Sequence, residues 1–94
     1  MRATVVDLVT PHLLRVVDLA SQAQRGANVD WHLRDAVSAT VHQLADQVNA
    51  SALLGAYVDG LESAAGQAPK GHVVYVQALR AAVDTTRRLW RDER

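Results

Sequence analysis

The sequence predicts an all-α fold, a small antiparallel helical bundle of three to four helices in one domain that covers residues 1–94. Apolar residues recur at three- and four-residue spacing and do not alternate with polar ones, which is typical of helices. Two stretches stand out as breaks in this pattern, QRGANVD at 24–30 and AAGQAPKG at 64–71. The apolar residues include 16 Ala, 14 Val and 11 Leu but no Phe and no Ile, so the helices can approach closely.

The first helix is expected at about 11–25. Thr10 and Pro11 fit an N-cap and a first helical position, because proline has no N–H to lose there. Gly26 then ends the helix. The preceding residues 3–9 contain three valines and are compatible with either a short helical turn or an edge strand.

The second helix is expected to begin after Asp30, a good N-cap. Its apolar stripe consists of Leu33, Val37, Val41, Leu44 and Val48. At Asn49–Ser51 the apolar residues change phase, which leaves two interpretations. Either one helix continues from 31 to about 65, or the chain breaks and forms helices at 31–49 and 51–65. We favour the break, because the phase change would turn the apolar face away from a straight seam.

The last helix is expected at about 69–92, beginning near Pro69. Its apolar face is unusually broad. The positions on this face are Tyr75, Val76, Ala78, Leu79, Ala82, Val83, Thr86, Leu89 and Trp90. A face of this width indicates contact on two sides. The last turn is rich in Arg, which suits the negative end of the helix dipole.

The composition suggests that the bundle is completed by association. A chain of this size buries only about 60–65% of its unfolded surface, and small side chains each add little buried area. The charges are also divided unevenly. Residues 1–69 carry four Arg against six Asp and one Glu, a net charge of −3, whereas residues 70–94 carry one Lys and five Arg against three acidic residues, a net charge of +3. Such regions attract each other within or between subunits.

These observations predict a non-catalytic helical module for protein–protein interaction or oligomerisation, with an accessory, adaptor, immunity or antitoxin-like role. The partner is expected to be another protein or a second copy, most simply as a homodimer. The interface candidates on the last helix are Tyr75, Val76, Leu79, Val83, Arg87, Trp90 and Arg91. The Val-rich N-terminal stretch, with Val5, Val6 and Val9, is a second candidate.

Histidine phosphotransfer through His42 is an alternative function, since a neutral imidazole exposed on a helix can accept a phosphoryl group. The stretch around it resembles in part the H-box of sensor histidine kinases, which His42, Leu44, Asn49 and Ala50 match. The stretch departs from that pattern where Gln43, Ala45 and Gln47 replace an acidic residue, an Arg and a Pro. The simpler interpretation is a surface histidine with Asp46 one turn away.

Nucleic-acid binding through the Arg-rich last helix is a further alternative, based on RRLWRDER at 87–94. The net charge of zero argues against strong nonspecific binding of this kind. Trp90 also falls on the apolar seam, which favours packing over base stacking.

Several chemical classes have no support in the sequence. The chain has no Cys, its four His share no ligand motif, and its Gly residues lack phosphate-loop spacing. We therefore expect no catalytic residues, no cofactor and no metal. No apolar run is long enough to span a bilayer, and we expect a cytoplasmic protein without membrane insertion.

Overall fold

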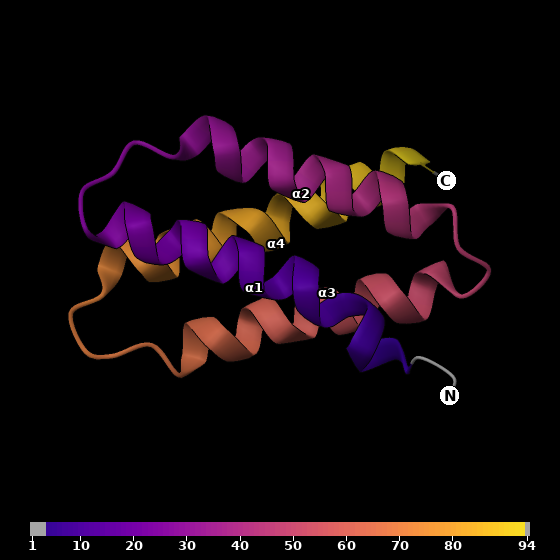
Figure 1. Cartoon of the computed structure of the whole chain (residues 1–94), viewed down its shortest axis with the longest axis horizontal. Coiled ribbons are helices and arrows are strands. Elements are labelled where there is room, and N and C mark those ends of the chain that lie inside the picture. Colours follow the sequence, from indigo (N-terminus) through magenta and orange to yellow (C-terminus); the bar gives the residue numbers. More distant parts are fainter. Residues whose placement is uncertain (1–3, 94) are drawn as a thin grey trace.

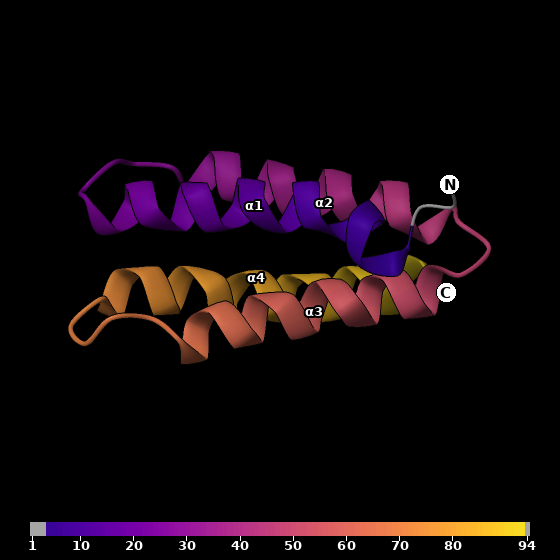
Figure 2. The same cartoon turned by 60° about the horizontal axis from the view of Figure 1, so that its bottom comes forward.

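The structure, a computed structural model, describes residues 4–93 and confirms the all-α prediction. Four helices make up the described part of the chain: α1 (Val5–Gln24), α2 (Asp30–Ala45), α3 (Ala50–Gly66) and α4 (Val73–Glu93). Successive helices run in opposite directions, as Figure 1 shows, so that α2 and α4 point the same way. The four helices form two layers, with α1 and α2 in one and α3 and α4 in the other (Figure 2).

The chain breaks between the second and third helices, as the favoured interpretation predicted. Helix α2 ends at Ala45 and α3 begins at Ala50, with a turn at 46–49. Val48 therefore does not continue the apolar stripe of α2. It lies in this turn with its side chain fully exposed, at 107% of the reference area. The predicted apolar stripe is one turn too long, because the helix ends at Ala45, before Val48.

The start of the first helix differs from the prediction. Helix α1 begins at Val5, and its N-cap is Thr4, whose hydroxyl accepts a hydrogen bond from the Asp7 N–H at 3.1 Å. The Asp7 carboxylate accepts the Thr4 N–H at 3.1 Å in return, which completes a capping box. Thr10 does not cap a helix, because its hydroxyl donates to the Val6 carbonyl one turn back at 2.6 Å. Residues 5–9 are thus helical and not a strand, Thr4 is the cap, and residue 3 lies outside the described residues.

Pro11 lies inside α1 and not at its first position. A proline at this point has no N–H to offer the carbonyl of Asp7, and its ring crowds that carbonyl. The first turns of α1 bend away from the rest of the helix, towards the layer of α3 and α4 (Figures 1 and 2). Pro11 is a sufficient cause of that bend. The bent turns bring Val9 into the core, where it is 1% exposed.

Two other helix starts are also shifted. Asp30 is the first residue of α2 and not its cap, since the N-cap position is Val29, which offers no side-chain oxygen. The last helix begins at Val73 and not near Pro69. The intervening residues form a turn closed by the His72 N–H donating to the Pro69 carbonyl at 3.1 Å, with Gly71 at a φ of +89°. Only glycine adopts that φ readily, so the turn rather than the helix occupies 69–72.

All four helices contribute to one core. The buried apolar residues of this core are Val9, Val16, Ala20, Ala36, Val37, Val41, Leu44, Leu53, Leu54, Tyr57, Leu61, Leu79, Ala82 and Val83. Helix α4 packs against each of the other three helices, which accounts for its broad apolar face within the chain itself. Helices α1 and α3 approach closely at Gly60, where an added Cβ would lie 2.5 Å from Leu13 Cδ1.

No helix among residues 4–93 is both long enough and apolar enough to cross a membrane.

Candidate protein-binding face

The interface candidates on the last helix fall into three groups in the structure. Leu79 and Val83 are enclosed in the core, with exposures of 0% and 4%. Tyr75, Val76 and Trp90 are half-buried, and Arg87 and Arg91 are exposed. Leu79 and Val83 therefore support the surface of α4 from inside, and a partner would meet other residues. Of the N-terminal candidates, Val9 is buried, Val5 is half-buried and Val6 is exposed.

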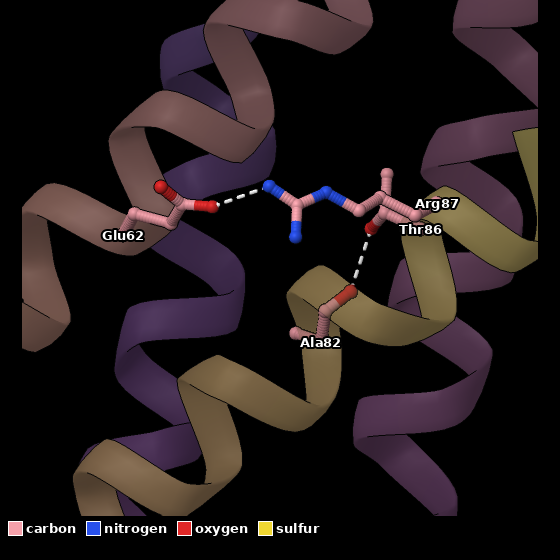
Figure 3. A network of polar contacts seen from close by, with 4 residues as sticks. All are labelled: Glu62, Ala82, Thr86 and Arg87. Atoms are coloured by element: carbon pink, nitrogen blue, oxygen red, sulfur yellow. Dashed lines mark hydrogen bonds and ion pairs between the residues drawn. The ribbon is translucent and has the colours of Figure 1, made fainter.

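Arg87 is already engaged within the chain. Its Nη2 lies 2.7 Å from Oε1 of Glu62, and this ion pair joins α4 to α3 (Figure 3). Both side chains are about half exposed, at 57% and 50%, so the pair contributes at most about 1 kcal/mol to stability. On the inner side of the same turn, the buried Thr86 hydroxyl donates to the Ala82 carbonyl at 2.7 Å. This region is a seam between helices and not an open basic surface.

Trp90 also belongs to this seam. It packs against the core and lines a small cavity of about 260 Å³ between α3 and α4. The cavity also has Leu54, Gly55 and Val58 from α3 in its wall. A tryptophan held in this way offers little of its face for base stacking, which requires an exposed ring.

A much larger groove, of about 970 Å³, runs between α2 and α4. Its wall on α2 consists of Asp30, Leu33, Arg34, Val37 and Ser38. Its wall on α4 consists of Val74, Gln77, Ala78, Ala81, Ala82, Asp84, Thr85, Arg88 and Leu89, and Ala23 of α1 completes it.

The groove combines small apolar residues with charges of both signs. Three alanines at 78, 81 and 82 line it on the α4 side, and Ala82 among them is only 5% exposed. Asp30 and Arg34 stand on one wall, and Asp84 and Arg88 on the other, each pair four residues apart. An apolar centre with a charged border is the usual anatomy of a protein-binding surface.

Two large apolar side chains are exposed near one end of this groove. Val74 lines the groove and is 44% exposed, and Trp31, next to Asp30 in the chain, is 77% exposed. Tryptophan is among the residue types most enriched at binding hot spots. The sequence reasoning did not include α2 or Trp31 in the candidate surface. The spacing of Ala78, Ala81 and Thr85 was the available signal, but it does not reveal which helix lies opposite.

His42 lies on the exposed side of α2, away from the buried stripe of Val37, Val41 and Leu44. This position agrees with the simpler interpretation of a surface residue. Asp46, one turn on, is exposed at the end of the helix. Within the described residues, no group of three or more His, Cys, Asp and Glu side chains is arranged to hold a metal ion.

A polar cluster not anticipated from the sequence lies inside the bundle. The Nδ1 of His12 and the hydroxyl of Thr40 are 3.2 Å apart and join α1 to α2. Burial and the neighbouring Arg15 lower the pKa of His12. Burial raises the pKa of Tyr57 on α3 to about 12, against a smaller opposing effect of the Thr40 hydroxyl. Among the described residues, none stands in hydrogen-bonding geometry to the Tyr57 hydroxyl.

Comparison of the chain with family models, with curated proteins and with solved structures finds no match. The site must therefore be interpreted from its own chemistry. The α2–α4 groove is lined by more residues than the α3–α4 cavity, and its walls carry alanines, valines and paired charges. Apolar residues bordered by charges are common at protein-binding surfaces in general.

Proposed function

We propose that this chain is a non-catalytic helical module that binds protein through the α2–α4 groove. The single observation that supports this most is the groove itself, about 970 Å³ in volume, with alanines along its α4 wall and the half-exposed Val74 in its lining. An amphipathic helix of a partner is a common occupant of a groove with apolar walls. An accessory, adaptor, immunity or antitoxin-like role is compatible with such a module.

Site-specific photo-crosslinking in the producing cells tests this function. A photoreactive residue in place of Ala81, which lines the groove, should give an adduct with a protein that mass spectrometry identifies. The same residue in place of Ala39, which is exposed on α2 but outside the groove, is the matched control. We expect the adduct at position 81 and not at position 39.

The identified protein would then be purified and its affinity measured against two variants. Ala81→Glu places a charge in the apolar centre of the groove and should abolish binding, whereas Ala39→Glu should leave the affinity unchanged. The absence of any adduct at position 81, or equal binding by both variants, would contradict the proposed function.

A further inference from the structure

The groove is bordered by charges of both signs, Asp30 and Arg34 on α2 and Asp84 and Arg88 on α4. Building on the proposed function, we propose that the α2–α4 groove receives α4 of a second copy of this chain, in antiparallel orientation. The resulting dimer is two-fold symmetric, so each copy donates its α4 to the groove of the other.

The first argument is the division of charge along the chain. Residues 70–94 carry a net charge of +3 and residues 1–69 a net charge of −3. Within α4 itself the balance is smaller, four Arg against two Asp and one Glu, a net charge of +1, and three of the four Arg lie in its C-terminal half. Because α2 and α4 point the same way, an antiparallel incoming helix brings its Arg-rich C-terminal half towards the start of α2 (Figure 1). Asp30 borders the groove there, and the partner's Arg88 is the cation that faces it.

The second argument is that the middle of α4 is self-complementary. Arg80 and Asp84 are both exposed and lie four residues apart, on either side of Ala82. A two-fold axis that crosses α4 at Ala82 places Arg80 opposite the partner's Asp84, and by symmetry Asp84 opposite the partner's Arg80. The helix extends over Val73–Glu93, so this axis lies close to its middle and the two helices overlap along almost their whole length.

The same charges discriminate against the neighbouring register. Moving the axis to the level of Asp84 would set this carboxylate against the partner's Asp84, and Arg80 against the partner's Arg88. Like charges placed face to face oppose association. The alternation of Arg80, Asp84 and Arg88 therefore selects one alignment of the two helices.

The third argument is the size of the side chains around the axis. Ala78 and Ala81 line the groove at this level, and Ala82, which is 5% exposed, lies beneath them in the core, so no large side chain at 78, 81 or 82 keeps two helix backbones apart. Val74, which is 44% exposed at the end of the groove, lies in this arrangement beside the last turns of the partner's α4. The pairing thus covers apolar surface at the centre and matches charge around it.

Sedimentation equilibrium on the full chain tests the charge pairing. Wild type should dimerise, and Arg80→Asp should raise the dimer dissociation constant by about tenfold or more, because two facing pairs become repulsive. The double variant Arg80→Asp with Asp84→Arg restores opposite charges across the axis and should return the constant to near the wild-type value. Arg15→Asp, an equal charge reversal on the exposed side of α1, should have no effect. Circular dichroism checks that all four chains are equally helical.

Cross-linking tests the geometry independently. The chain has no Cys, so a single introduced cysteine can react only with its counterpart in another copy. Ala81→Cys lies next to the proposed axis and should be joined rapidly into a dimer by a short bis-maleimide. Ala39→Cys should not.

A wild-type chain that stays monomeric at all concentrations would overturn the second-copy proposal. A dimer that is insensitive to Arg80→Asp, or one that cross-links at position 39 but not at 81, would also overturn it. These results are distinct from failure of the proposed function. An adduct of position 81 with a different protein would retain the binding function and refute only the second copy as occupant.

Discussion

Polar side chains from three helices meet within the otherwise apolar interior, and burial shifts the pKa of two of them, His12 and Tyr57. Thr40 is 3% exposed and approaches His12 across the α1–α2 contact, while the hydroxyl of Tyr57 is buried without a good partner. A buried polar group without a hydrogen bond typically costs about 1–3 kcal/mol. The fold therefore tolerates an unfavourable contribution here, and the ionisation of His12 and Tyr57 provides a way to measure it.

The lowered pKa of His12 predicts a loss of stability in mild acid. Below pH 6.5 the unfolded chain binds a proton at this histidine, whereas the folded chain resists it until the pH falls to the lower folded pKa. The unfolding free energy should therefore fall as the pH drops through that window. Urea unfolding of His12→Asn should show a flatter dependence between pH 7 and 5. A wild-type slope that persists in His12→Asn would contradict the assignment.

Tyr57 predicts the opposite, alkaline sensitivity. Its pKa rises from 10.0 to about 12 in the folded chain, so the unfolded state loses the proton first as the pH increases. The contribution of Tyr57 to the unfolding free energy should be fully present below pH 10. It should be lost between pH 10 and 12, by an amount on the order of 2 kcal/mol.

The variant Tyr57→Phe should lack that contribution and should be as stable as wild type, or more stable, at pH 7, because it removes a hydroxyl without a partner. The half-buried Tyr75→Phe serves as the control in the same denaturant titrations. A large loss of stability at pH 7 in Tyr57→Phe would show that the hydroxyl has a partner after all.

At the scale of the helices, the ends and bends are set by single local interactions. Thr4 and Asp7 begin α1 through a reciprocal capping box, Pro11 allows the helix to continue with a bend, and Gly71 turns the chain into α4. The pairing of α3 with α4 is reinforced at the surface by Arg87 and Glu62. Each element boundary can therefore be tested by one substitution.

Removing the cap of α1 should destabilise the whole bundle. Thr4→Ala deletes the hydroxyl that accepts the Asp7 N–H and should lower the unfolding free energy by about 1 kcal/mol. Thr10→Ala, which removes a hydroxyl bonded to the carbonyl of Val6 one turn back, should have a smaller effect. Chemical denaturation of the two variants compares their losses of unfolding free energy. A greater loss in Thr10→Ala would indicate that the helix begins at Pro11.

At the scale of the whole molecule, each of the four helices contacts the other three. The inner positions Leu79 and Val83 of α4 are enclosed by the rest of the chain, whereas the turn at 46–49 has Val48 fully in solvent. Stability should therefore be distributed unevenly along the chain.

Native-state hydrogen exchange should reveal that distribution. The amides from Leu79 to Thr86 should exchange last, with protection that approaches global unfolding, and the amides of the 46–49 turn should exchange first. The measurement is exchange followed residue by residue at neutral pH. Faster exchange of the amides from Leu79 to Thr86 than of the amides of α1 would contradict this predicted distribution of stability.

The sequence predicted the features that depend on periodicity and missed those that depend on neighbours. The helical class and a break between the second and third helices followed from the apolar phase, although the break was expected at Asn49–Ser51 and lies at 46–49. Thr10 and Pro11 formed a locally favourable start, but the earlier pair of Thr4 and Asp7 outcompetes it. A broad apolar face on the last helix was visible, yet spacing alone could not tell that the chain covers Leu79 and Val83 itself. The groove escaped prediction because its walls come from two helices that are far apart in the sequence.

The even number of helices has a practical consequence for handling this protein. Helix α1 begins and α4 ends at the same end of the bundle, while Trp31 and Val74 stand towards the opposite end, where α2 and α4 begin (Figure 1). An affinity tag, a fluorescent domain or a surface tether attached at either terminus would therefore be remote from the exposed tryptophan. A short loop could equally join the two ends, and new ends could be opened in the 46–49 turn to give a circularly permuted chain.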